Sequence, residues 1–68
     1  MDEWFVLEVS TGYSVFDGLG AEAFFISKEE ADKVCTYFNA TNVDGKSCDL
    51  EEEIEKALAN TAIIKVKV

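Results

Sequence analysis

The sequence has 68 residues, of which 49% are hydrophobic, a composition typical of one small folded domain and not of an acidic disordered tail. Fourteen acidic residues against six basic ones give a formal net charge of −8, and such a field repels nucleic acids, anionic membranes and acidic substrates. No apolar run approaches the length of a membrane span, and the first residues lack the basic segment of a signal peptide, so we expect one compact domain over residues 1–68 in the cytoplasm.

The first predicted element is a strand over residues 4–10, where aromatic and β-branched residues predominate. Its alternation puts three apolar residues on one face of the strand: Phe5, Leu7 and Val9. We expect this face to pack on helices, which leaves Trp4 and Val6 on the opposite face of the sheet.

Two interpretations remain open for the segment after the first strand. Thr11-Gly12 closes a tight hairpin into a second strand over residues 13–16 in one interpretation, since glycine is typical of such turns. In the other, residues 10–20 form one long loop that contains three glycines. Residues 22–26 are the next predicted strand in both cases.

Two capped helices are expected after the strands. Ser27 and Glu30 have the spacing of a capping box, and Asp49 with Glu52 repeats it. The apolar stripe of the first helix consists of Ala31, Val34, Cys35 and Phe38. The stripe of the second helix consists of Leu50, Ile54, Ala57 and Leu58, and Asn60 ends that helix.

The last predicted element is a strand over residues 61–68, whose alternation turns its two lysines outward. The resulting order is β(β)βααβ. It predicts an α+β domain, in which a small antiparallel sheet of three to four strands carries two helices on one face.

The face of the sheet that points away from the helices is expected to be apolar too, although a solvated face should alternate to polar residues. Its expected residues are Trp4, Val6, one of Phe24 and Phe25, and Ile63. One interpretation is that a loop around residues 13–16 covers this face. We favour the other, an interface, most simply of a homodimer in which Trp4, Val6 and Ile63 contact the second copy.

Carboxylates are concentrated at the starts of both predicted helices. They are Glu29, Glu30, Asp32, Asp49, Glu51, Glu52, Glu53 and Glu55. An acid in the first turn stabilises a helix by about 0.3–1 kcal/mol, but one or two acids per helix are enough for this effect. Residues 49–55 alone place five acids over roughly 9 Å of helix, a charge spacing close to that of duplex DNA. The excess indicates either a solubilising surface or a binding surface.

With this row of acids, the sequence resembles the small acidic phage-encoded DNA-mimic proteins of host takeover. The resemblance is one of size and charge pattern, without a shared motif or fold. It implies a non-enzymatic inhibitor that presents a DNA-like surface to a basic nucleic-acid-binding protein, such as an HU-type nucleoid protein, a polymerase or a defence nuclease. It also implies a dimer that extends the charged surface. The alternative is a small adaptor or subunit that binds through its apolar sheet face, with the acids serving solubility.

Residues 40–51 approximate a calcium-binding loop. Positions three, five, six and twelve of such a loop would be Asn42, Asp44, Gly45 and Glu51. Ala40 replaces the aspartate expected at position one, and loss of that ligand should cripple affinity, so we expect no metal. The alternative is an Asx-type turn that Asn42 and Asp44 build around Gly45.

The sequence offers little support for an enzyme. It has no histidine, which excludes a histidine general base and any His-containing zinc site. Cys35 is expected in the core, whereas Cys48 precedes a helix N-terminus that could lower its pKa but has no base partner. A disulfide between them is not expected in a reducing cytosol. We therefore expect no catalytic residue and no cofactor.

Overall fold

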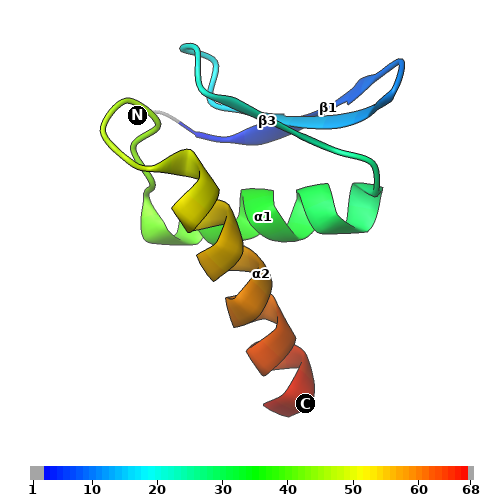
Figure 1. Cartoon of the computed structure of the whole chain (residues 1–68), viewed down its shortest axis with the longest axis vertical. Coiled ribbons are helices and arrows are strands. Elements are labelled where there is room, and N and C mark those ends of the chain that lie inside the picture. Colours follow the sequence, from blue (N-terminus) through cyan, green and yellow to red (C-terminus); the bar gives the residue numbers. More distant parts are fainter. Residues whose placement is uncertain (1–2, 68) are drawn as a thin grey trace.

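The computed structural model describes the backbone of residues 3–67 and the side chains of residues 3–59 (Figure 1). Its elements in chain order are β1 (Phe5–Val9), β2 (Gly12–Phe16), β3 (Glu22–Phe25), α1 (Lys28–Thr41) and α2 (Leu50–Lys67). The strands form one antiparallel sheet in the order β1-β2-β3. The predicted α+β class, with a three-stranded sheet and two helices, is confirmed.

The hairpin interpretation of residues 10–20 is confirmed, and the long-loop interpretation is wrong. β1 pairs with β2 from Phe5 opposite Phe16 to Val9 opposite Gly12, so only two residues form the turn between the strands. Gly12 has a φ of 153°, and a Cβ at this position would overlap the carbonyl oxygen of Phe25 in β3. Only glycine fits here, because a side chain would separate the end of the hairpin from β3.

The two faces of β1 are reversed relative to the prediction. Trp4, just before the strand, is 3% exposed and belongs to the core, and Val6 packs against that core. Phe5 and Leu7 are 40% and 42% exposed on the opposite face. Both sets of alternating residues are apolar, so hydrophobicity could not choose between them. Burial of Trp4 is favoured because its indole is large and its N–H donates a hydrogen bond to the carbonyl oxygen of Val43 at 3.0 Å.

The predicted dimer interface must therefore be corrected. Trp4 and Val6 face α1, so they are not available to a second copy on the other side of the sheet. Ile63, the third predicted interface residue, lies outside the side chains that the structure describes. In the other interpretation, a loop around residues 13–16 covered the face of the sheet away from the helices. These residues form strand β2 of the sheet itself, so they do not cover that face.

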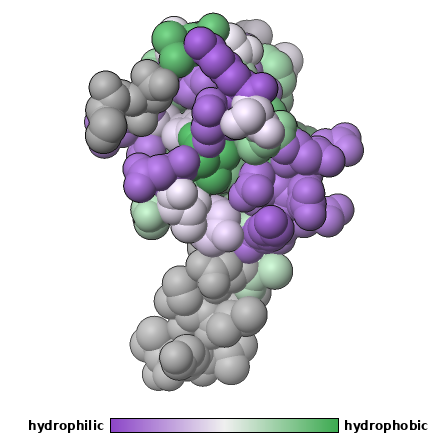
Figure 2. Space-filling model, turned by 90° about the vertical axis from the view of Figure 1, so that its left-hand side faces the viewer, coloured by the Kyte–Doolittle hydropathy of each residue, from purple (hydrophilic) through white to green (hydrophobic). Residues whose placement is uncertain are grey.

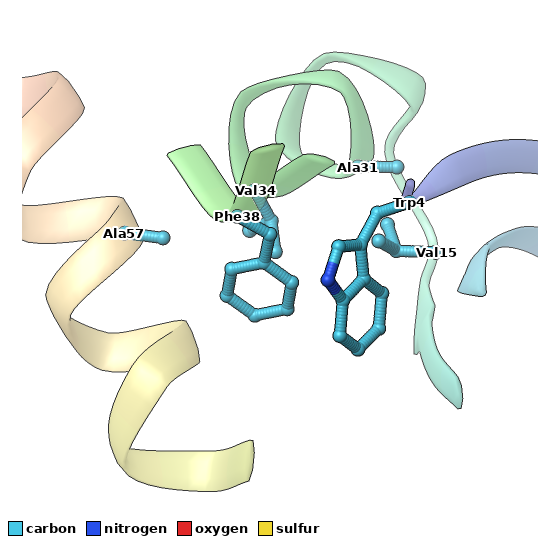
Figure 3. Close-up of a cluster of buried hydrophobic side chains, with 6 residues drawn as sticks. All are labelled: Trp4, Val15, Ala31, Val34, Phe38 and Ala57. Atoms are coloured by element: carbon cyan, nitrogen blue, oxygen red, sulfur yellow. The ribbon is translucent and has the colours of Figure 1, made fainter. Parts of the chain in front are cut away.

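The core lies between the sheet and α1. Ala31, Val34 and Phe38 of the predicted stripe are buried, while Cys35 at its margin is half-buried. The rings of Trp4 and Phe38 meet edge to face, with centroids 4.8 Å apart (Figure 3). Aromatic pairs in this geometry contribute roughly 0.5–1.5 kcal/mol beyond the burial of their area.

α1 alone covers the sheet, and α2 packs on α1. Ala57 of α2 is fully buried and points toward Phe38 (Figure 3). In Figure 1, α2 begins on the sheet side of α1, passes in front of α1 and then runs away from the rest of the molecule. Both helices therefore lie on one side of the sheet, as predicted; α1 packs on the strands, and α2 packs on α1.

The strand predicted over residues 61–68 is also wrong as far as the structure reaches, because α2 continues to Lys67. Val68 lies outside the described residues. The helix contains neither glycine nor proline, and its β-branched residues cost at most about 0.7 kcal/mol each relative to alanine. Asn60 therefore does not end the helix. An alternating apolar segment with no strand beside it to pair with can remain helical.

Candidate interaction surfaces

We call the side of the sheet that α1 leaves uncovered the outer sheet face. The strand register assigns it Phe5, Leu7, Val9, Gly12, Ser14, Phe16, Glu22 and Phe24. Phe24 is the most exposed of these apolar side chains, at 66%, ahead of Phe5 and Leu7. The rings of Phe5 and Phe16 pack edge to face across the strands, with centroids 5.6 Å apart. The outer sheet face is thus apolar, exposed and ordered by its own cross-strand contacts.

The polar groups on the outer sheet face are paired with each other. Ser14 is fully buried between its neighbours on this face, and its hydroxyl donates to Oε2 of Glu22 at 2.6 Å. Within the three described strands, Glu22 is the only charged residue on this side, since Glu8 lies opposite Tyr13 on the other side. The face therefore carries one carboxylate, and that carboxylate already has a hydrogen-bond donor.

A shallow depression of ≈ 360 Å³ lies at the hairpin end of the sheet. It is lined by Val9, Thr11, Gly12, Tyr13, Phe24, Phe25 and Ile26. The lining comes from both sides of the sheet. Val9, Gly12 and Phe24 belong to the outer sheet face, and Tyr13 and Phe25 to the side that faces α1. Ile26, at its rim, is 89% exposed. Tyr13 is the only titratable residue in the lining, so the depression suits an apolar group and offers no acid–base pair.

The predicted acidic surface lies on the helices and not on the sheet. Three of its eight residues are paired with lysines of the same helix: Asp32 with Lys28 at 3.0 Å, Glu53 with Lys56 at 3.5 Å, and Glu29 with Lys33 at 3.7 Å. Lys56 pairs with Glu53, three residues before it, and not with Glu52, which lies four residues before it. These pairs are local and mostly exposed, so each contributes little to stability.

The remaining acids are exposed, and among the described side chains they form no ion pair. They are Glu30, Asp49, Glu51, Glu52 and Glu55. Asp49 has a structural task, because its Oδ1 accepts the amide of Glu52 at 3.4 Å and caps α2 as predicted. Hydrophilic residues spread over much of the face seen in Figure 2, with smaller apolar areas between them. The negative charge is therefore dispersed over the helices, with a short unpaired row at the start of α2.

The loop between the helices is built around Asp44. Its Oδ1 accepts the amide of Lys46 at 3.0 Å, and its Oδ2 accepts the hydroxyl of Ser47 at 3.1 Å, which confirms the Asx-type turn at this residue. Asn42 has a different role, since it ends α1 in the left-handed conformation at φ 55°. Over the described part of the chain, no three His, Cys, Asp or Glu side chains come together as a metal site.

Both cysteines are free thiols and half-buried. Burial, together with the nearby carboxylate of Asp32, raises the pKa of Cys35. Burial and the carboxylate of Glu53 raise the pKa of Cys48, so the expected lowering by the helix N-terminus is overcome. Thiols with a raised pKa are protonated at neutral pH and are poor nucleophiles.

One polar anchor that the sequence did not reveal ties β1 to α1. The amide of Trp4 donates to Oδ1 of Asn39 at 2.7 Å, and Nδ2 of Asn39 donates to the carbonyl oxygen of Trp4 at 3.0 Å. One side chain thus satisfies both backbone groups at the start of an edge strand. Asparagine after an apolar stripe is a common helix residue, so no sequence signal marked this pairing.

The second unpredicted anchor is Asp17, which is 7% exposed. Its Oδ1 accepts the amides of Leu19, Gly20 and Ala21 at 2.8, 3.0 and 3.0 Å. Burial acts to raise the pKa of this carboxyl, but the backbone amides outweigh it and hold the pKa below its ordinary value. The loop between the helices closes on this anchor, because a Cβ at Gly45 would lie 2.7 Å from Oδ2 of Asp17. The sequence marks Asp17-Gly18 as a turn, but it does not show that the loop between the helices packs against this turn.

Comparison with known protein families, with curated proteins and with solved structures found no match. Within residues 3–67, neither helix combines the length and apolar character that crossing a bilayer requires. The candidate functional features are therefore the two surfaces described above, the outer sheet face and the unpaired acids of the helices.

Proposed function

We propose that this protein is a non-enzymatic binding module whose contact surface is the outer sheet face. The observation that carries the proposal is the exposure of Phe5, Leu7 and Phe24 side by side on one face of an ordered sheet. Antiparallel sheets that face water alternate to polar residues, and contiguous apolar patches on small soluble proteins mark interaction sites. This corresponds to the adaptor or subunit interpretation of the sequence.

The outer sheet face is organised before any partner binds. Its strands are fixed by their ladders, its rings by the contact between Phe5 and Phe16, and its polar groups by the bond from Ser14 to Glu22. A surface of this kind loses little conformational entropy on binding, so the cost of ordering it subtracts little from the affinity. The matching partner surface is apolar at its centre, with polar groups at its rim.

Affinity capture with matched variants tests this proposal. Phe24→Lys places a charge at the most exposed apolar position, while Thr36→Lys makes the same change on the exposed side of α1. We expect Phe24→Lys to lose the proteins that the wild-type protein captures from a cell lysate, and Thr36→Lys to retain them, with both variants folded by circular dichroism. Equal capture by the two variants would show that the outer sheet face is not the contact surface.

A second candidate function is the DNA mimic, favoured by the exposed carboxylates of Glu51, Glu52 and Glu55 on α2, which form no ion pair with the side chains of residues 3–59. In this function the protein inhibits a basic nucleic-acid-binding protein, such as an HU-type nucleoid protein, by occupying its DNA site. The complex would weaken steeply as salt rises, because exposed charges are screened beyond about 8–10 Å at physiological ionic strength.

Charge reversal separates the second candidate from the first. The triple variant Glu51→Lys, Glu52→Lys and Glu55→Lys should abolish binding to a basic partner, whereas Phe24→Lys should leave it intact. Duplex DNA should also compete with the wild-type protein for that partner. Full affinity of the triple variant, or simultaneous binding of DNA and this protein, would reject the DNA mimic.

A further inference from the structure

We propose that the occupant of the outer sheet face is a second copy of this chain, packed sheet against sheet in a symmetric dimer. This inference rests on the proposed function and names the partner. Two sheets packed face to face lie about 10 Å apart and bury their facing side chains between them. The product has four layers, with α1 and α2 of each copy on the outside and the two sheets in the middle.

The distribution of charge favours this arrangement. Each copy carries a net charge of −8, so two copies approach only through a surface with few charges. The outer sheet face is such a surface, since Glu22 is its only charged residue among the described strands and its carboxylate accepts the Ser14 hydroxyl. The helix carboxylates are then held apart by the thickness of two sheets, where solvent and salt screen them.

The shape of the outer sheet face is also self-complementary. Phe24 projects from β3 and borders the depression of ≈ 360 Å³ at the hairpin end of the sheet. In a dimer with two-fold symmetry, when a side chain of one copy enters the depression of the other, the same side chain of the second copy enters the depression of the first. Phe24 has this role in the dimer, with Val9 and Ile26 forming the walls around it.

The available area sets the strength of the dimer. With about 200 Å² for a whole large apolar side chain, the exposed parts of Phe5, Leu7, Phe24 and Ile26 offer roughly 500 Å² per copy. The total of about 1,000 Å² is at the lower limit for a specific interface. The dimer should therefore be reversible, with a dissociation constant on the order of 10–100 µM.

Sedimentation at protein concentrations from roughly 5 to 500 µM, which bracket this dissociation constant, measures the expected equilibrium. The wild-type protein should change from monomer to dimer across this range, and Phe24→Lys should weaken the dimer at least about tenfold, as loss of a central apolar anchor does. Thr36→Lys carries the same net charge and should dimerise like the wild-type protein. Isotope-filtered nuclear Overhauser spectra should show contacts between Phe24 of one copy and residues Val9 and Ile26 of the other.

A wild-type protein that remains monomeric over the whole range, or a dimer that Phe24→Lys leaves unchanged, would overturn the second copy as occupant. If the wild-type protein is monomeric but Phe24→Lys loses the proteins captured from lysate, the proposed function stands with a different partner. If the wild-type protein is monomeric and Phe24→Lys captures the same proteins, both the dimer and the proposed function are overturned. Salt supplies an independent readout, since raising it from roughly 50 to 300 mM should strengthen a dimer of two acidic chains.

Discussion

On the helix side of the sheet, Trp4 and Val15 are almost completely buried, whereas Phe24 on the outer side is two-thirds exposed. Both sides are apolar, and they are separated by a single layer of backbone. They differ in the elements that cover them: α1 returns over one side, and no described element returns over the other (Figure 1). Apolar content alone therefore does not identify the core of so small a domain, because a neighbour must be present to bury it.

The largest expected effect is on the helix side. Phe38→Ala should destabilise the protein by about 3–5 kcal/mol, because it removes the ring on which Trp4 and α2 pack. A core of this size supplies only about 3–5 kcal/mol in total, so the variant should be largely unfolded at room temperature. Phe24→Ala on the outer side is the matched control and should cost less than about 1 kcal/mol in urea unfolding followed by circular dichroism. Similar losses in the two variants would contradict the contrast between the faces.

The next effect concerns the anchor between β1 and α1. Asn39→Ala leaves the amide and the carbonyl of Trp4 without their partner and should cost about 2–3 kcal/mol. Since Trp4 is the only tryptophan, its fluorescence should shift toward the red as water reaches the indole. Thr36→Ala, on the exposed side of α1, should alter neither the emission nor the unfolding midpoint. An unshifted spectrum in Asn39→Ala would show that burial alone holds the indole.

Acid should loosen the edge where the loop between the helices meets the sheet. The pKa of Asp17 in the folded state lies below its ordinary value of 3.8, so ionised Asp17 stabilises the fold above that pH, and this contribution is lost as the pH falls through the folded value. Asp17→Ala removes the acceptor of three amides and should cost about 1.5 kcal/mol at neutral pH. Thermal midpoints between pH 7 and about pH 2 should fall less steeply in this variant than in the wild-type protein. Parallel profiles would assign the acid sensitivity to other carboxyls.

The smallest effect is at the start of α1. The Ser27 hydroxyl accepts the amide of Glu30 at 3.4 Å, so Ser27→Ala should cost about 1 kcal/mol. Ser27→Asp keeps an acceptor at the cap and should restore most of the loss. Chemical denaturation of the three proteins side by side measures this, and a loss in both variants would indicate that the serine acts by some other contact.

The features that depend on local sequence were predicted well. The cap at Ser27 and the stripe through Ala31, Val34 and Phe38 depend on spacing along one helix, and the structure has both. The exposure of the acids was predictable for a similar reason, because unpaired carboxylates are expensive to bury.

The features that depend on distant neighbours were not predicted. The buried face of β1 could not be read from a strand that is apolar on both sides, and the choice was made by partners such as Asn39 and Val43. Residues 61–67 carry a strand-like alternation, yet they continue α2. The apolar exposed face itself was predicted, with Phe24 among its candidates, but with Trp4 and Val6 in place of Phe5 and Leu7.

The anchor of Trp4 also bears on the order of events during synthesis. The turn between β1 and β2 has two residues, so this hairpin can close as soon as both strands have been made. Trp4, however, bonds to Asn39 and Val43, which lie 35 and 39 residues later in the chain. A growing chain therefore exposes both apolar faces of its hairpin until α1 and the loop after it are complete. Contacts of such separation slow folding, so the nascent chain passes through an interval in which either face can be captured by a chaperone or by another chain.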